Sequence, residues 1–183
     1  MALSNKQLLP VSIGIAVQAA VLVLLNAFIP KLTGGMDLMW VSFQAWAVYF
    51  LAGCTPMGGV KAWLGYFSGI VASVAIIEIM KPLGIQPVFG MNIAMALAVF
   101  IVVIPAIMTE NLKNFVPALF IGSGAFFASL GAATGAAETA KCACSCAPYV
   151  YAARAVLVYC LVGQIFGWVT VLCRSRYEAS LAK

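Results

Sequence analysis

Residues 88–109 read VFGMNIAMALAVFIVVIPAIMT and contain no charged side chain. A helix that crosses the hydrocarbon core of a bilayer needs about 20 mainly apolar residues, so this stretch is long enough to span a membrane. Similar apolar stretches fill most of the 183-residue chain. They predict six transmembrane helices, at about residues 9–30, 38–54, 60–80, 88–109, 115–137 and 148–173.

The overall composition supports the same environment. Hydrophobic residues make up 64% of the sequence and charged residues 8%, and the mean hydropathy is +1.08. A soluble domain carries about 25% charged residues, and this chain has too few to cover a water-facing surface. Because lipid accepts apolar side chains on the outside of a protein, we predict an all-α polytopic membrane protein. We expect six transmembrane helices in one compact bundle, a single domain over residues 1–183 that contacts the lipid bilayer.

The basic residues predict the orientation of these helices. With six spans, the two termini and the second and fourth loops share one side of the membrane. That side carries Lys6, Lys61, Lys113, Arg174, Arg176 and Lys183. The opposite side carries Lys31, Lys81 and Lys141, with Arg154 inside the sixth span near that side. Because Lys and Arg collect in cytoplasmic loops, we expect both termini in the cytoplasm.

The residue inventory argues against catalysis and against nucleic-acid binding. The chain has no histidine, the commonest general base and metal ligand near neutral pH. Its five acidic residues are scattered, and no P-loop glycine pattern is present. The net charge of +5 comes from basic residues spread between the apolar stretches, which favours membrane orientation over a polyanion-binding patch. We therefore expect no enzyme activity, no cofactor and no nucleic-acid partner.

Small residues recur at helical spacing, where they let two backbones approach closely. The rows are Gly65, Gly69 and Ser73 in the third span, and Gly124, Ala128, Gly131 and Gly135 in the fifth. Such rows pack helices within one chain or between the subunits of a homo-oligomer, and both interpretations stay open.

Two hairpins of the chain look alike. Ala47-Val48-Tyr49-Phe50 is followed by Lys61, and Ala98-Val99-Phe100 is followed by Lys113. The offset of two helices predicts a parallel repeat of a helical hairpin. Transport proteins are often built from such repeats.

A few polar side chains interrupt the apolar spans, where a buried polar group needs a partner or a role. Candidates for a solute path are Gln44, Asn92, Arg154 and Gln164. The amides either bridge helices or line a path for a small uncharged solute. Arg154 either snorkels to the interface or faces a cavity and attracts an anion or a polar solute. Glu78 is expected to pair with Lys81, three residues further along the helix.

Three cysteines cluster in one loop, at Cys142, Cys144 and Cys146. The predicted topology places this loop outside the cytoplasm, where disulfides persist. A Cys-x-Cys pair is awkward to bridge, and thiolates at this spacing could instead bind Cu(I) or zinc. The alternative is a short loop of small residues with no metal.

Two short segments carry a family resemblance. The first is Phe50-Leu51-Ala52-Gly53-Cys54-Thr55 followed by Gly58-Gly59-Val60-Lys61, and the second is Asn114-Phe115-Val116-Pro117 followed by Phe120-Ile121-Gly122 and Phe126. They resemble the YcdZ-like family of small bacterial inner-membrane proteins of unknown function, over about residues 9–173. The resemblance implies a multi-span protein of the bacterial inner membrane and marks a family-like turn at Gly53, Cys54, Thr55, Gly58, Gly59 and Lys61. The cysteine-rich segment from Glu138 to Ala147 departs from the family pattern.

These observations lead to two hypotheses of function. The first is a small-solute channel or facilitator, homo-oligomeric, for a small uncharged or anionic solute. The alternative is a non-transporting accessory or assembly subunit of a membrane complex, with a metal or thiol role for the Cys142–Cys146 loop.

Overall fold

The computed structural model describes residues 5–83, 92–140 and 144–181, and this part of the chain is helical without strands. The elements are α1 (Asn5–Leu25), α2 (Ile29–Leu32), α3 (Met39–Leu51), α4 (Pro56–Leu83), α5 (Ile93–Met108), the 3-10 helix η1 (Thr109–Leu112), α6 (Val116–Thr139) and α7 (Ala147–Leu181). The predicted all-α membrane fold is confirmed.

The predicted number of six spans is approximate. Five described helices are long and apolar enough to cross a membrane, namely α1, α4, α5 with η1, α6 and α7. The remaining candidate, α3, has 13 residues. At 1.5 Å per residue it is about 20 Å long, shorter than the hydrocarbon core of about 30 Å. The chain therefore has five long helices and one short apolar helix.

Helix ends follow local chemistry more closely than they follow hydropathy. α4 begins at Pro56, earlier than predicted, because Thr55 Oγ1 accepts a hydrogen bond from Gly58 N at 3.0 Å and caps the first turn. α7 continues to Leu181 because Arg174 pairs with Glu178 one turn later, at 2.8 Å. Charged residues end the apolar segment, but they do not end the helix.

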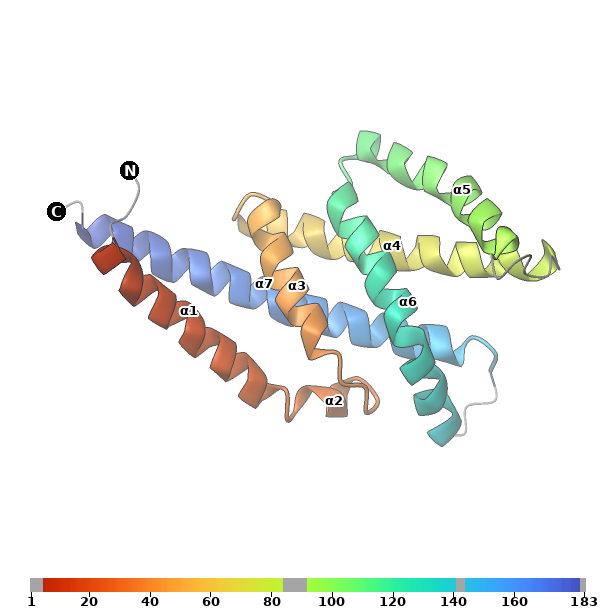
Figure 1. Cartoon of the computed structure of the whole chain (residues 1–183), viewed down its shortest axis with the longest axis horizontal. Coiled ribbons are helices and arrows are strands. Elements are labelled where there is room, and N and C mark those ends of the chain that lie inside the picture. The colour runs from red at the N-terminus through yellow and green to blue at the C-terminus, as the bar shows by residue number, and fades with distance from the viewer. Residues whose placement is uncertain (1–4, 84–91, 141–143, 182–183) are drawn as a thin grey trace.

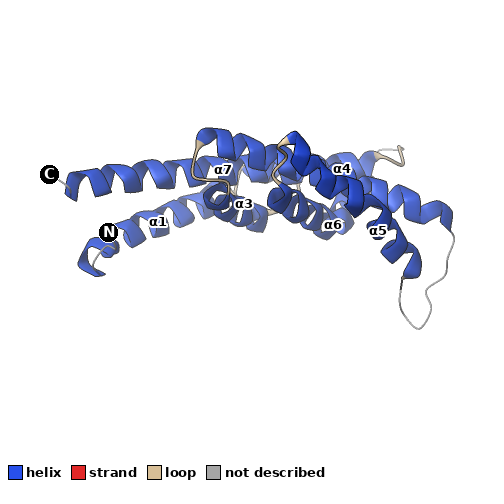
Figure 2. Cartoon of the chain, turned by 90° about the horizontal axis from the view of Figure 1, so that it is seen from above, coloured by secondary structure: helices blue, strands red, loops and turns tan. Residues whose placement is uncertain are grey.

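The helices form two layers. Figure 2 shows α4 and α7 in one layer and α1, α3 and α6 in the other, with α5 beside α4. In Figure 1, α4 and α7 run in opposite directions along the longest axis of the molecule. The start of α1 and the end of α7 lie at the left of that view, and the α3–α4 and α5–α6 turns lie along its upper side.

Two sets of three helices have matching roles in this arrangement. α3 packs mainly on α7 and α6 packs mainly on α4, while α1 lies on α7 and α5 lies on α4. In Figure 1 each helix of the set α1–α3–α4 runs opposite to its counterpart in α5–α6–α7. The packing therefore has the form of an inverted repeat. The repeat expected from the sequence is a different one, because it pairs the hairpin α3–α4 with the hairpin α5–α6. Each of these hairpins contains one non-glycine residue with positive φ in its turn, Cys54 in the first and Lys113 in the second.

Glycine pairs bring the two layers together. Gly65 and Gly69 of α4 lie against α6, and Gly163 and Gly167 of α7 lie against α3. A Cβ on Gly69 would collide with the backbone oxygen of Leu119, so the α4 and α6 backbones are in direct contact. Ser73 extends this interface through a 2.6 Å hydrogen bond between its hydroxyl and that of Ser123.

The small-residue row of α6 points the other way. Gly124, Ala128, Gly131 and Gly135 are exposed, and a Cβ added to any of the three glycines meets nothing within 4 Å. The reason is that α6 turns a different face inward, which carries Ala118, Gly122, Ala125, Ser129 and Ala133. Packing inside the chain therefore applies to the row in α4 and not to the row in α6.

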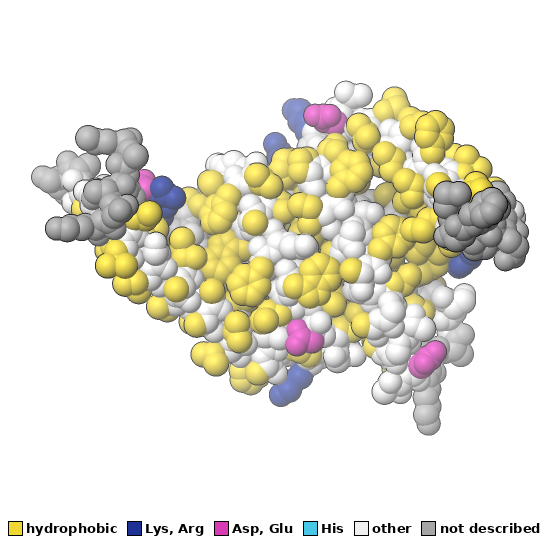
Figure 3. Space-filling view, in the orientation of Figure 1, with side chains coloured by type: hydrophobic (Ala, Val, Ile, Leu, Met, Phe, Trp, Pro, Cys, Tyr) yellow, Lys and Arg dark blue, Asp and Glu magenta, His cyan; other side chains and the backbone are white. Residues whose placement is uncertain are grey.

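The molecular surface matches a lipid environment. Figure 3 shows many apolar side chains across the visible face and few charged groups. Large exposed hydrophobic side chains occur on α1, α3, α4, α5, α6 and α7. This is a multi-pass membrane protein whose outer surface carries many large hydrophobic side chains.

A candidate site between helices 3, 4 and 7

Three buried polar atoms in the described part of the chain have no hydrogen-bond partner: Tyr49 Oη, Tyr66 Oη and Gln164 Oε1. Their residues are 1%, 0% and 6% exposed. A buried polar group without a partner costs about 1–3 kcal/mol, so each one needs a structural or functional explanation.

The Gln164 side chain is held in one orientation. Its Nε2 donates a hydrogen bond to the backbone oxygen of Ala45 at 2.9 Å, which ties α7 to α3. Because the nitrogen must face this carbonyl, the orientation of the side-chain amide is fixed. The Cys160 thiol lies one turn away beside the amide, but it does not satisfy the side-chain oxygen Oε1. Gln164 Oε1 is therefore a buried acceptor without a hydrogen-bond partner.

Glycines on both sides hold Tyr49 next to Gln164. A Cβ on Gly59 would lie 3.0 Å from Tyr49 Cε2 and 3.4 Å from Gln164 Oε1. A Cβ on Gly167 would lie 2.6 Å from Tyr49 Cβ. The preceding turn uses positive φ values at Gly53 and Cys54, 93° and 57°, to reverse the chain. This turn brings Gly59 of α4 back onto the last turn of α3.

These residues line a pocket of about 440 Å³ between α3, α4 and α7, which we call the α3–α4–α7 pocket. Tyr49, Gly59 and Gln164 lie on its buried side, and Trp63 and Trp168 are among its walls. The remaining lining residues are Pro56, Val60, Leu161 and Ile165. None of these described side chains is charged. Trp168 and its aliphatic neighbours are about half exposed, so the pocket opens at the apolar outer surface.

The structure separates the four candidates for a solute path. Gln164 lines the pocket. Gln44 is exposed on the opposite face of α3, and Arg154 is exposed in the second turn of α7. Asn92 caps α5, where its Oδ1 accepts a hydrogen bond from Met95 N at 2.9 Å. Three of the four thus lie outside the pocket, at a helix end or on an outward helix face.

The family-like turn contributes to the pocket through Gly59 alone. Gly53, Cys54 and Thr55 form the turn itself, and Gly58 donates to the Thr55 cap. Lys61 is exposed one turn into α4. The turn is therefore a scaffold that positions one wall of the pocket.

Sequence reasoning missed Tyr49, Tyr66 and the second glycine pair. The available signal was spacing, because Gly163-Gln164-Ile165-Phe166-Gly167 repeats the pattern of Gly65-Tyr66-Phe67-Ser68-Gly69. Tyr66 and Gln164 follow the first glycine of each pair, on the third helix of each set. The two unsatisfied groups on α4 and α7 thus occupy matching positions.

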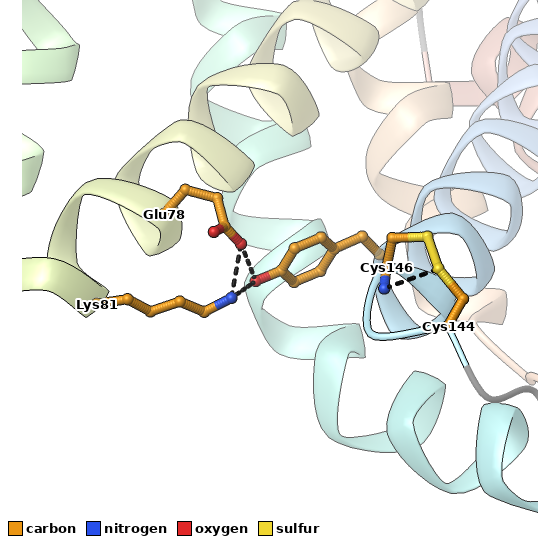
Figure 4. A network of polar contacts seen from close by, with 5 residues as sticks. Glu78, Lys81, Cys144 and Cys146 are labelled. Atoms are coloured by element: carbon orange, nitrogen blue, oxygen red, sulfur yellow. Dashed lines mark hydrogen bonds and ion pairs between the residues drawn. A yellow bond between two sulfur atoms is a disulfide. The ribbon is translucent and has the colours of Figure 1, made fainter.

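A separate polar cluster lies where the end of α4 meets the start of α7 (Figure 4). Lys81 and Glu78 form the expected ion pair at 2.6 Å, and the Tyr149 hydroxyl donates to Glu78 Oε1 at 2.8 Å. Both charged side chains are about half exposed. The cluster therefore joins the end of α4 to the start of α7.

The cysteine loop ends next to this cluster, where Tyr149 N donates to Cys146 O at 3.1 Å. Cys144 and Cys146 form a disulfide, although the sequence suggested that such a pair is awkward to bridge. Cys142 lies outside the described residues. Within the described ranges no three His, Cys, Asp or Glu side chains come together, and the disulfide leaves its two sulfurs without the thiolate that a metal requires.

Comparison with known proteins yields a family and no activity. A family model with the description "Protein of unknown function (DUF1097)" matches residues 12–174. No curated protein and no solved structure matches the chain.

Proposed function

Because the chain belongs to the DUF1097 family of proteins of unknown function, we propose its function from its own structure. We propose that it is a facilitator that lets a small uncharged solute cross a membrane. The observation that carries this proposal is the pocket between the two sets of helices, whose lining includes Tyr49 and Gln164, two residues that each have a buried polar atom without a partner. In this proposal the protein performs no catalytic step.

The helix arrangement supports a transport role. Many secondary transporters consist of inverted repeats, and their solute sites lie where the repeats meet. The pocket has this location, since α3 and α4 come from one set of helices and α7 from the other. An anionic solute fits less well, because Arg154 is exposed and is not among the pocket residues.

The proposed location is a bacterial inner membrane with both termini in the cytoplasm, which agrees with the resemblance to YcdZ-like proteins. Two features support this orientation. The start of α1 and the end of α7 lie on the same side of the molecule (Figure 1). The Cys144–Cys146 disulfide lies near the opposite helix ends, as expected for the oxidising side of the membrane.

The direct test is solute flux into liposomes that contain the purified protein. We expect faster entry of urea, acetamide or glycerol than into empty liposomes. The Val60→Trp variant should lose this gain, because Val60 lines the pocket and a larger ring there would fill the opening. The control is Val71→Trp, since both valines lie on α4 and are 53% exposed but Val71 lies outside the pocket. Equal flux with and without protein across this panel would contradict the proposal.

One observation favours the accessory role as a second candidate. The exposed row of Gly124, Ala128, Gly131 and Gly135 offers a flat helix face that nothing in the described chain covers. Such a face suits close packing with another helix, from a second copy or from a different protein. Purification from native membranes in mild detergent separates these cases. A stoichiometric foreign subunit supports the accessory role, and a homo-oligomer supports the facilitator.

A further inference from the structure

We propose that the Cys144–Cys146 disulfide is a thiol–disulfide exchange site, which oxidises a pair of thiols to a disulfide and is itself reduced to two cysteines. This inference is independent of the proposed transport function, because neither cysteine lines the α3–α4–α7 pocket.

A structural role explains this disulfide poorly. It joins two residues that are two positions apart in the sequence, so only Ser145 lies between them. A disulfide stabilises a protein mainly by restricting the unfolded chain, and this effect is smallest for the shortest loops. Both cysteines also precede Ala147, the first residue of α7, so the bond connects no two helices. The disulfide therefore adds little to the stability of the fold.

The disulfide is accessible to a reacting thiol. Cys144, Ser145 and Cys146 are all exposed, whereas Cys160 in the middle of α7 is fully buried. Exchange begins when a thiolate attacks one sulfur of the disulfide, so access to the sulfurs is its first requirement. Exposed disulfides are also reduced more readily than structural ones.

The surroundings of the two sulfurs differ, and this difference sets the order of the exchange. Cys144 Sγ accepts a hydrogen bond from Cys146 N at 3.4 Å, at the start of α7 (Figure 4). This N–H stabilises negative charge on the Cys144 sulfur. Glu78 and Lys81 contact the far end of the Tyr149 side chain, and their opposite charges offset each other. Cys144 is therefore the better leaving group.

One exchange balances in atoms and electrons. A thiolate of the substrate attacks Cys146 Sγ and forms a mixed disulfide with it, while the bond between Cys144 and Cys146 breaks and its electron pair leaves on Cys144. The second substrate thiolate then attacks the substrate sulfur of the mixed disulfide, and Cys146 leaves as a thiolate. The two protons of the substrate thiols end on the two cysteines. Two electrons have passed from the substrate to the protein.

A single-turnover assay on the full-length protein in lipid nanodiscs measures this exchange. The starting variant carries Cys54→Ser, Cys142→Ser and Cys173→Ser, which leaves the disulfide and the buried core cysteine. We suggest mixing its oxidised form with an equimolar synthetic peptide that has two cysteines, and counting thiols on both by the mass added by a maleimide. We expect the protein to gain as many thiols as the peptide loses, and trapped intermediates to carry the peptide on Cys146.

A matched variant and a second thiol source complete the test. Cys144→Ser in the same background removes the disulfide from the exposed loop and should oxidise no peptide. Glutathione supplies its thiols one at a time, so at equal thiol concentration it should react more slowly than the peptide, whose second thiol acts within one molecule. In a glutathione buffer poised like the cytosol most of the disulfide should be reduced, whereas structural disulfides resist such a buffer.

Four results would overturn the inference. They are free thiols at Cys144 and Cys146 in protein purified without reductant, a disulfide that stays oxidised in the glutathione buffer, equal oxidation of the peptide by the Cys144→Ser variant, and trapped peptide mainly on Cys144. None of these results bears on solute flux, which the liposome assay measures separately.

Discussion

Three buried tyrosines show how differently one residue type is used in this protein. Tyr49, Tyr66 and Tyr159 are each at most 1% exposed. The Tyr159 hydroxyl donates to Asn26 Oδ1 at 2.9 Å, and Asn26 in turn donates to Asp37, so it joins α7 to the end of α1. The hydroxyls of Tyr49 and Tyr66 have no partner. Two of these hydroxyls are therefore unfavourable for folding, and one is favourable.

Replacing these tyrosines by phenylalanine should therefore have opposite effects on the free energy of unfolding. Tyr159→Phe should lower the free energy of unfolding by about 1 kcal/mol, because it removes a made hydrogen bond. Tyr49→Phe and Tyr66→Phe should leave it unchanged or raise it by a similar amount, because each removes an unpaired buried hydroxyl. Thermal unfolding in one detergent, without added ligand, measures all three. A loss of stability in Tyr49→Phe equal to that in Tyr159→Phe would mean that Tyr49 has a partner.

The long helices α4 and α7 owe their positions to two glycine pairs. Gly69 lies against the backbone of α6, and Gly163 lies against the backbone oxygen of Ser42 in α3. A neighbouring side chain can rotate away from an added methyl group, but a neighbouring backbone cannot. The approach of these helices therefore depends on the absence of a Cβ at these positions.

Alanine substitutions should separate contact glycines from surface glycines. Gly69→Ala and Gly163→Ala should each destabilise the protein by about 1–3 kcal/mol or more, because the facing backbones must move apart. Gly124→Ala is the matched control on α6, where an added Cβ meets nothing within 4 Å. It should be neutral or slightly stabilising, because alanine favours a helix. The yield of monodisperse protein and its unfolding temperature report the difference, and equal behaviour of all three variants would contradict the packing described here.

The whole molecule has two distinct ends. The α3–α4 turn, with the exposed Cys54, lies on the same side as the start of α1 and the end of α7 (Figure 1). The Cys144–Cys146 disulfide lies at the start of α7, on the other side. The free cysteine and the disulfide therefore lie at opposite ends of the molecule.

Cysteine labelling tests this topology together with the proposed orientation. In intact spheroplasts, a membrane-impermeant maleimide should label Cys144 and Cys146, but only after treatment with an impermeant reductant. Cys54 should stay unlabelled until the membrane is permeabilised. Variants that retain only one of these sites, with serine at the other cysteines, make the signals separable. Labelling of Cys54 in intact spheroplasts would reverse the orientation, and labelling of both sites would contradict the topology.

Much of the fold could be predicted because it depends on local composition. Five of the predicted spans correspond to long helices, since a run of about 20 apolar residues has few stable alternatives in lipid. The span predicted at 38–54 corresponds to the shorter α3 (Met39–Leu51), and the extension of α7 to Leu181 was not predicted. Their limits depend on a turn with positive φ and on an ion pair beyond the apolar segment, which hydropathy does not report.

The site could be predicted only in part. Gln44, Asn92, Arg154 and Gln164 all interrupt apolar stretches, yet only Gln164 lines the pocket. Likewise, both rows of small residues have helical spacing, yet the row in α4 is buried and the row in α6 is exposed. Spacing shows which residues share a helix face, but not what lies opposite that face.

The amino-acid sequence alone thus determined the solvent and the helical class of this protein, because both depend on the average polarity of contiguous residues. The tertiary structure decided which polar groups have partners and where a pocket forms. Those properties depend on contacts between distant segments, as when Ala45 of α3 binds the amide of Gln164 and leaves its oxygen free. Whether a buried acceptor has a partner depends on all the helices packed around it, and this arrangement is known only from the tertiary structure.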